Sequence, residues 1–306
     1  MTIQTLSEWL RCPSCFASPL EALPPLQLRC PNGHSFDANK RGYLTALGPA
    51  SARLRGDDAA MLDARDLVHD AGFFDPLKRE LAAVLRDAAL APEPRVLDAG
   101  CGTGHYTALA LEALLGATEQ DPRVLAMDLS PAAVARTVRR RLESVDGLVA
   151  DTWQPLPVRD SSVDVILDVF APRNASEFHR ILRPGGLLLV VVPRPEHLQE
   201  LRTDGRVLTI PEGKAAALVE ELAPRFALRT ARSVDARFAL DQDAAADDRL
   251  AAAIVAMGPS AHHRTAEPAA GSQRLPEAIT LAVDLLVFDA VGDAAEADSV
   301  GEPVRK

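Results

Sequence analysis

Near its centre the sequence reads Arg95-Val96-Leu97-Asp98-Ala99-Gly100-Cys101-Gly102-Thr103-Gly104. The first five residues have the composition of a short buried strand, and the glycines that follow are typical of a tight turn. Residues 107–115 then place apolar side chains at helical spacing. Strand, glycine turn and helix in this order open a nucleotide-binding βαβ unit. The stretch therefore predicts the first strand of such a fold and its ligand-binding loop.

Four more apolar segments continue the pattern. Strands are expected at residues 124–129, 147–151, 163–170 and 185–192, and a last strand at 277–288. Ser130 and Pro131 suit the cap and first position of a helix after the second strand. Strands separated by crossover helices form a doubly wound, mostly parallel sheet. The expected fold class is α/β.

The glycine turn has a more specific resemblance. Its D-x-G-C-G-x-G pattern resembles motif I of class I S-adenosylmethionine-dependent methyltransferases, and Leu182-Arg183-Pro184-Gly185-Gly186 resembles the turn before their fifth strand. Dehydrogenases instead use G-x-G-x-x-G, whose third glycine accommodates a pyrophosphate that S-adenosylmethionine lacks. The pattern favours a Rossmann-like class I methyltransferase. A Rossmann-like protein that has lost its ligand is the alternative.

The resemblance implies a set of cofactor contacts. Asp98 is expected to order the loop or meet the amino end of the cofactor, and Asp128, which ends the second strand, to hold the ribose diol. Asp151 is expected to face the adenine, although it also suits an ordinary strand-end carboxylate. The residues expected to line the cofactor from the loop are Gly100, Gly102, Thr103 and Gly104.

The N-terminal region carries a second motif. Cys12 and Cys15 form C-P-x-C, and Cys30 and His34 follow as C-P-x-x-H. Two short ligand pairs on tight turns are typical of a tetrahedral zinc site, and four protein ligands leave no open position, so the predicted zinc ion is structural. The alternative is a set of scattered thiols. Only Cys101 remains, so the sequence offers no disulfide framework and favours a reducing, cytoplasmic setting.

Charge is distributed unevenly. The net charge of −10 argues against a protein that coats nucleic acid with its whole surface. Residues 1–55, however, hold six basic residues against three acidic ones, so the remainder carries −13. The candidate phosphate contacts in this mildly basic region are Lys40, Arg41, Arg53 and Arg55. Their alternative role is that of solvated surface charges.

The motifs taken in order have a closer resemblance. The zinc knuckle precedes F-D-x-x-K-x-G-Y from Phe36, G-D-x-x-x-M-x-x-A-R from Gly56 and D-A-G-x-[FY]-x-P-L from Asp70. After the glycine loop come F-A-P at Phe170 and P-x-P-x-H-L-x-E-L from Pro193. This series resembles the 23S rRNA guanine-N1 methyltransferases, one branch of which confers macrolide resistance. It covers residues 10 to 265, approximately.

That family implies further residue roles. Its zinc ligands fall on the four residues named above, and its cofactor contacts fall on Phe74, His197 and the loop residues Gly102 and Thr103. Phe74 stands where some relatives have tyrosine, so only stacking or packing is expected of it. His197 also suits a polar residue at a helix start. His262 and His263 replace an aromatic residue and an arginine, which puts that substrate contact in doubt.

The domain organisation follows from the same resemblance. Residues 1–50 are expected to form a zinc-binding, RNA-recognising module, 51–90 a helical linker, 91–288 the methyltransferase domain and 289–306 a disordered acidic tail. The expected cofactors are S-adenosylmethionine and zinc. The expected partner is 23S rRNA, with a homodimer as an assembly to be tested. Neither a secretion signal nor a membrane span of about 20 apolar residues is recognisable.

Guanine N1 carries a proton that must leave on methylation, which favours a general base. Asp168 ends the fourth strand in the conventional position for one, and the backbone carbonyls of residues 170–172 are its rivals. Phe170 is expected to stack on an unstacked nucleobase. The predicted reaction is therefore methylation of a guanine N1 in a 23S rRNA hairpin, with a role in macrolide resistance to be tested. The alternative is a small-molecule methyltransferase with a purely structural zinc cap, which the acidic net charge favours.

Overall fold

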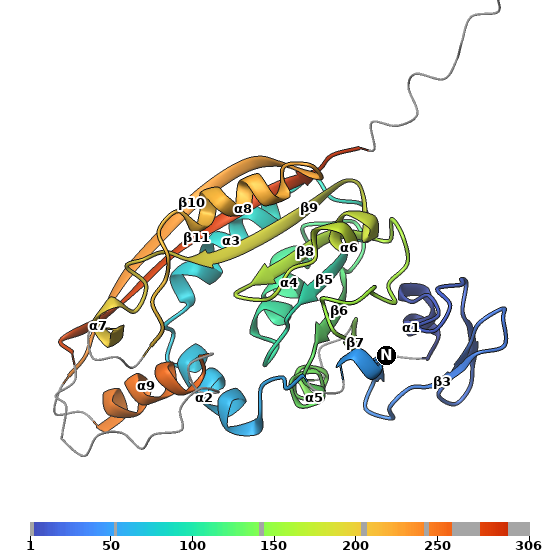
Figure 1. The fold of residues 1–306 in the computed structure, drawn as a ribbon, viewed down its shortest axis with the longest axis horizontal. Helices are drawn as coiled ribbons and strands as arrows, with labels where there is room; N and C mark the ends of the chain where they lie inside the picture. The colour runs from blue at the N-terminus through green and yellow to red at the C-terminus, as the bar shows by residue number, and fades with distance from the viewer. Residues whose placement is uncertain are drawn as a thin grey trace, which may run out of the picture.

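A computed structural model describes residues 3–51, 54–140, 144–202, 207–241, 245–258 and 276–292. Its main body is an eight-stranded sheet (Figure 1). The strands lie in the order β10 (Phe226–Ala239), β11 (Ala278–Ala290), β9 (Leu182–Pro193), β8 (Val163–Val169), β5 (Arg95–Ala99), β6 (Arg123–Asp128), β7 (Val145–Val149) and β4 (Tyr43–Thr45). The strands from β9 to β4 are parallel, and β11 is antiparallel to both neighbours. The predicted fold class is confirmed.

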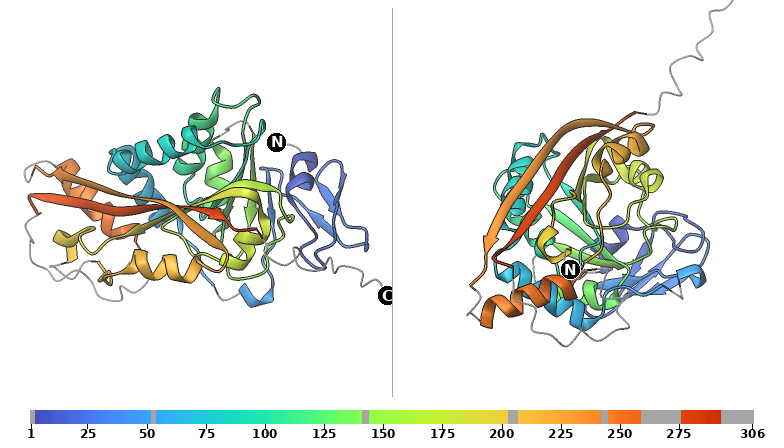
Figure 2. Two further views of the ribbon diagram at one scale, coloured as in Figure 1. Left: turned by 90° about the horizontal axis from the view of Figure 1, so that it is seen from above. Right: turned by 60° about the vertical axis from the view of Figure 1, so that its left-hand side comes forward.

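Helices cover both faces of this sheet, as the views in Figure 2 show. One core contains apolar side chains of α3 (Asp75–Asp87), α4 (His105–Leu114) and α5 (Pro131–Arg139). The other contains those of α1 (Ile3–Trp9), α6 (Ala175–Ile181) and α8 (Lys214–Leu222). Along β5, Val96 belongs to the first core and Leu97 to the second. A strand buried on both faces in this way reads as a continuous apolar run.

Side-chain caps fix where several helices begin. Ser130 accepts a hydrogen bond from the backbone N–H of Ala133 at 3.3 Å, and Pro131 is the first residue of α5. This confirms the predicted helix start. Asp58 caps α2 (Ala59–Asp70) in the same way by accepting from Met61 N–H at 2.9 Å. Each cap satisfies an N–H that the helix itself leaves without a partner.

Strand β5 lies in the interior of the sheet, and the direction in which successive strands are added changes beside it. The chain continues from β5 to β6 and β7 on one side and returns to β8 and β9 on the other. In open α/β sheets the ligand crevice lies outside the carboxyl ends of the strands at this switch point. The glycine loop and the segment after β8 both start there, and they touch: a Cβ on Gly100 would lie 2.5 Å from Cβ of Ala171.

The N-terminal segment is joined closely to the large sheet. It forms a small antiparallel sheet from β1 (Glu21–Leu23), β2 (Gln27–Arg29) and β3 (Ser35–Asp37), preceded by α1. Trp9 Nε1 of α1 donates to Asp146 Oδ2 at 2.9 Å, and Glu8 pairs with Arg95 at 3.3 Å and with Arg123. Strand β4 then adds to the edge of the large sheet beside β7. Residues 1–50 therefore share a core with the methyltransferase fold across the predicted boundary.

After β9, the described part of the chain contributes one predicted and one unpredicted strand to the large sheet. The last predicted strand is confirmed as β11, which pairs with β10 in antiparallel orientation along most of its length. Strand β10 was not among the predicted strands. Most of its side chains are exposed or half-buried, so apolar residues mark its inward-facing positions only in part. The minor elements are η1 (Pro49–Ser51), α7 (Gln199–Arg202) and α9 (Ala245–Ala256). Of the predicted tail, Asp289 and Ala290 belong to β11, whereas 293–306 lie outside the described residues, as do Arg53, His262 and His263.

Candidate active site and metal centre

Two carboxylates flank the glycine loop. Asp98, near the end of β5, accepts a hydrogen bond from Thr107 Oγ1 of α4 at 2.6 Å, and its burial raises its pKa to about 7. Asp128, at the end of β6, accepts from the backbone N–H of Gly102 at 3.0 Å and of Ser130 at 2.8 Å. Its pKa is also raised by burial. Asp128 thus holds the loop directly, and Asp98 joins the end of β5 to α4, the helix that follows the loop.

Asp151 is the third acid at this edge of the sheet. It is buried, and it accepts hydrogen bonds from Ser51 Oγ at 2.8 Å and from the backbone N–H of Trp153 at 3.0 Å. Ser51 comes from η1, far away in sequence, and the motif analysis did not single it out. The adenine role of Asp151 stays a prediction, and its carboxylate is oriented by these two donors.

Phe74, Phe170 and His197 form a row of rings. The ring centroids of Phe74 and Phe170 are 5.8 Å apart, and those of Phe170 and His197 are 6.0 Å apart with nearly parallel planes. His197 Nδ1 accepts a hydrogen bond from Ala282 N–H at 3.3 Å, and burial lowers the pKa of His197 to about 4. The imidazole is therefore neutral near pH 7, with its proton on Nε2. The fold thus unites three predicted site residues from three different segments.

Asp168 lies at the carboxyl end of β8 and is fully buried. Arg173 Nε donates to its Oδ2 at 3.1 Å, whereas Oδ1 has no hydrogen-bond partner among the described residues. Burial raises the pKa of Asp168 to about 7; the charge and hydrogen bond of Arg173, the backbone N–H of Ala171 and the charge of Lys214 oppose that rise. A carboxylate with one oxygen fixed and the other unpartnered is suited to accept a proton.

Other buried polar atoms around the loop also lack partners. Within the described residues they are Tyr106 OH in the first turn of α4 and His69 Nδ1, whose ring stacks on that of His105 with the centroids 4.2 Å apart. The Thr103 hydroxyl, in contrast, interacts with the Asp66 carboxylate. Hydrogen bonds from Arg136 and, to a smaller extent, from Thr103 lower the pKa of Asp66. Buried polar groups normally have partners. These residues therefore fit a polar ligand such as S-adenosylmethionine.

The glycine loop gives a first testable prediction. Gly100→Ala should destabilise the protein and weaken cofactor binding, because φ of Gly100 is +91° and the new Cβ would meet Ala171. Gly116→Ala is the matched control, since Gly116 has φ +73° but open space around it. The left-handed backbone alone costs about 1–2 kcal/mol. Urea unfolding and calorimetric titration with S-adenosylmethionine measure both effects; equal losses in the two variants would contradict the contact with Ala171.

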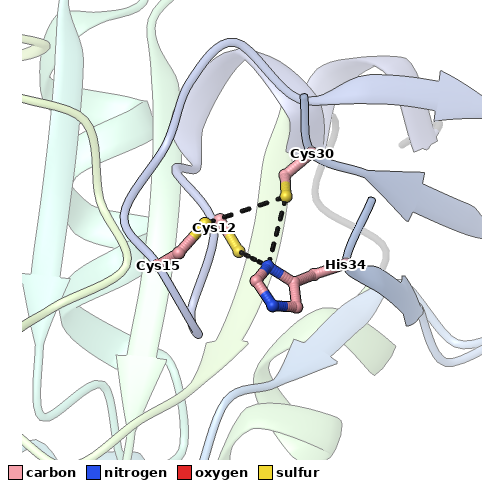
Figure 3. A group of neighbouring side chains, drawn as sticks. All are labelled: Cys12, Cys15, Cys30 and His34. Carbon is pink, nitrogen blue, oxygen red and sulfur yellow. Dashed lines mark hydrogen bonds between the residues drawn. The ribbon is translucent and has the colours of Figure 1, made fainter. Parts of the chain in front are cut away.

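The cysteine and histidine pairs converge on one point (Figure 3). The ligand atoms of Cys12, Cys15, Cys30 and His34 all lie within 4.8 Å of one another. His34 Nδ1 is 3.4 Å from Cys30 Sγ and 3.6 Å from Cys12 Sγ. Tetrahedral zinc with bonds of about 2.0–2.3 Å places its ligand atoms at similar separations.

Two of the three thiols have a lowered pKa, Cys15 and Cys30, whereas burial raises the pKa of Cys12. A hydrogen bond from the backbone N–H of Ala17, and then one from the Asn32 amide, lower the pKa of Cys15 to about 6. The thiolate is the form that binds a metal. Three thiols and one imidazole on two turns therefore form a closed set that fits a structural zinc ion.

The candidate phosphate contacts lie on the surface. Lys40 and Arg41 are exposed and line a cavity of about 420 Å³ between the small sheet and the start of α1, together with Ile3 and Leu26. Arg55 is exposed as well. The structure leaves all three side chains accessible for a polyanion.

Three residues that sequence reasoning did not assign to the site lie next to predicted site residues. Arg65 lies over the glycine loop, Arg173 holds Asp168, and Trp153 is 64% exposed beside Asp151. Arg65 is the last residue of the motif that begins at Gly56, but the motif does not indicate which group it contacts. Nothing in the sequence around Trp153 distinguishes an exposed indole from a buried one.

Comparisons with known proteins agree with this site. A family model described as "Methyltransferase domain" matches residues 96–186. The 23S rRNA (guanine(748)-N(1))-methyltransferase of Streptomyces fradiae is 40% identical over 257 residues, which cover 84% of this chain and 86% of that protein. A Micromonospora griseorubida relative, provisionally named a 23S rRNA (guanine-N(1)-)-methyltransferase, is 37% identical over 297 residues, covering 90% of this chain and 95% of its own. The chain therefore belongs to the family of 23S rRNA guanine-N1 methyltransferases.

Proposed function

We propose that this protein methylates N1 of a guanine in a hairpin of 23S rRNA with S-adenosylmethionine as donor. The observation that carries the proposal is the 40% identity, over most of both chains, to a relative named for that reaction. The geometry supports it through the ordered glycine loop, the unpartnered polar atoms around it and the ring pair of Phe74 and Phe170. A zinc ion held by the Cys12 cluster is proposed as a structural component.

The cofactor supplies an electrophilic methyl group, and the protein has to position the acceptor and exclude water. Asp128 holds the loop, Asp98 joins β5 to α4, and the free lone pairs of Asp128 are proposed to accept from the ribose hydroxyls. Asp151, oriented by Ser51, is proposed to face the adenine. Phe74 and neutral His197 are proposed to form apolar and polar walls of the same site.

On the substrate side, Phe170 is 40% exposed and has φ +56°, so the chain turns sharply where its ring projects. An exposed ring here is proposed to stack on the target guanine, as RNA-binding aromatic residues do with unstacked bases. Asp168 Oδ1 is proposed to accept the N1 proton while Arg173 retains Oδ2. The exposed cations Lys40, Arg41 and Arg55, with Arg53, are proposed to bind RNA phosphates.

Trp153 provides a direct report of RNA binding. The sequence has two tryptophans, of which Trp9 is fully buried and Trp153 is 64% exposed. The Asn174 side chain joins the Trp153 loop to the segment after β8, since its Nδ2 donates to Thr152 O at 3.0 Å. We expect an unmodified 23S rRNA hairpin to quench the Trp153 fluorescence. Trp153→Ala should weaken RNA binding by about 1–3 kcal/mol, the usual contribution of one stacked base.

Trp153→Phe is the control, because it keeps a stacking ring while removing the fluorophore. It should bind the hairpin nearly as tightly as the unaltered protein but without quenching. Quenching that persists in Trp153→Phe would assign the signal to Trp9 and contradict the stacking role.

The proposed reaction is tested with labelled cofactor. The protein is incubated with naked 23S rRNA that lacks the modification, and in parallel with total metabolites. We expect label in the RNA and a primer-extension stop at one guanine; the S. fradiae relative is named for guanine 748. Label only in the metabolite pool would favour the alternative, a small-molecule methyltransferase with a purely structural zinc cap.

Three finer properties belong to the same proposal. A stop at the position of the S. fradiae relative, together with lower macrolide susceptibility of a host that expresses the protein, would support a role in resistance. A homodimer is tested by light scattering of the free protein. The proposed location is the cytoplasm, where ribosomal RNA would be met; in the described parts of the chain, no helix combines the length and apolar character that spanning a membrane requires.

A further inference from the structure

Arg65, on α2, packs directly on the glycine loop. A Cβ on Gly102 would lie 2.9 Å from Arg65 Nη1 and 3.5 Å from its Cδ, so the guanidinium lies against the loop backbone. Arg65 Nη1 pairs with Asp57, and Nη2 donates to Met257 O at 3.2 Å. A guanidinium has five N–H donors, so these two contacts leave further N–H donors of Arg65 available for a ligand. Helix α2 lies beside α9 (Figure 1), and Met257 directly follows α9 in the chain.

The charges around the loop are mostly negative. Asp98, Asp128 and Asp57 all lie next to it. Burial raises the pKa of both Asp128 and Tyr106, and the positive charge of Arg65 opposes the rise in each. The charge of Arg65 therefore lies close enough to both groups to affect their pKa values. Arg140 also reaches the loop, donating from Nε to Thr103 O at 2.7 Å, but its Nη2 is engaged with Asp66 at 3.1 Å.

S-adenosylmethionine brings two cationic groups, the sulfonium and the amine, and one carboxylate. The acids around the loop suit the cations, whereas the carboxylate requires a cation or a set of N–H donors. Arg65 is the described cation that contacts the inner glycine of the loop while retaining unengaged donors. Guanidinium and carboxylate groups match in planar, two-pronged geometry.

We propose that Arg65 binds the α-carboxylate of the cofactor, exchanging its ion pair with Asp57 for this contact. The inference rests on the proposed use of S-adenosylmethionine and adds a specificity-determining residue to it. The competing role is purely structural: Arg65 would only join α2, α9 and the segment before α2. The two roles differ in one respect, because only the first distinguishes a ligand that has the carboxylate from one that lacks it.

The test compares S-adenosylmethionine with decarboxylated S-adenosylmethionine by calorimetric titration of the full chain without RNA. We expect the unaltered protein to prefer the carboxylated ligand. Arg65→Met should weaken binding of S-adenosylmethionine about 10- to 100-fold, the usual effect of losing a hydrogen bond to a charged group. Binding of the decarboxylated ligand should change less than about threefold, since it never made that contact. Arg65→Lys should retain part of the preference for the carboxylated ligand, because lysine keeps the positive charge but lacks the planar pair of N–H donors.

Arg136→Met is the matched control. Arg136 pairs with Asp63 and Asp66 of α2 at 2.7 and 2.8 Å, so its loss perturbs the same helix while Arg65 stays in place. It should leave the preference between the two ligands unchanged. Equal weakening of both ligands by Arg65→Met, or an unaltered preference in Arg65→Lys and Arg65→Met alike, would overturn the inference. Failure of the unaltered protein to bind either ligand would instead overturn the proposed cofactor.

Discussion

Asp168→Asn should lower the single-turnover rate of guanine methylation about 10²- to 10⁴-fold, the range that general bases contribute. Asparagine has nearly the same shape and can still accept from Arg173, so the buried contact at 3.1 Å is largely preserved. It cannot take up the N1 proton through the oxygen that is now unpartnered. Affinity for S-adenosylmethionine and for the RNA hairpin should stay close to that of the unaltered protein.

The pH dependence gives a second readout of the same role. Burial raises the pKa of Asp168 to about 7, so the carboxylate form increases as the pH rises through 7. A base acts in its deprotonated form, and the rate should therefore rise with pH and level off above the pKa. The Asp168→Asn variant should lose this inflection. A retained inflection would assign the titrating group elsewhere.

Asp164→Asn is the control for a buried aspartate on the same strand. Asp164 is buried near the start of β8, where it accepts from Arg95 N–H at 2.8 Å and from Arg183 Nη1 at 2.9 Å. Its replacement should lower the free energy of unfolding without a comparable loss of rate. If both variants lost the same rate, Asp168 would act through the fold, and the backbone carbonyls of residues 170–172 would become the preferred acceptors.

Cys15→Ser should release the proposed zinc ion and abolish binding of the RNA hairpin while binding of S-adenosylmethionine persists. A serine hydroxyl cannot replace a thiolate whose pKa is lowered to about 6 by the Ala17 N–H. Structural zinc stabilises its module directly, so the turns at Cys12 and Cys30 should lose their shape. Zinc release by a colorimetric chelator, RNA binding by filter retention and cofactor binding by calorimetry measure the three effects.

The methyltransferase fold should survive this change because other contacts hold the N-terminal segment. Trp9 bonds to Asp146, Glu8 pairs with Arg95, and Arg11 N–H donates to Pro157 O at 2.9 Å. Ser14→Ala is the matched control, since Ser14 is exposed in the same turn and is not a ligand. Parallel loss of cofactor and RNA binding in Cys15→Ser would show that the metal supports the whole fold rather than an RNA-binding surface.

Much of the fold could be predicted from local pattern. The strand and glycine loop at residues 95–104, the cap at Ser130 and the positions of the parallel strands β5 to β9 along the chain all depend on neighbours close in sequence. The convergence of Cys12, Cys15, Cys30 and His34 was predictable for the same reason, because two turns set the direction of each ligand pair. Strand β10 was not predicted although its burial alternates from Arg229 to Ala239, because polar Thr230 and Arg232 occupy half-buried positions and obscure the apolar period.

The sequence by itself determined the fold class, the family and the two ligand-binding motifs, because turn chemistry and strand period are encoded within a few residues. Only the tertiary structure decided that Arg65 lies on Gly102, that Asp168 retains an unpartnered oxygen and that β4 joins the N-terminal segment to the large sheet. These three facts depend on packing between segments far apart in the chain. Local residue preferences do not specify such contacts, whereas close packing around a shared core does.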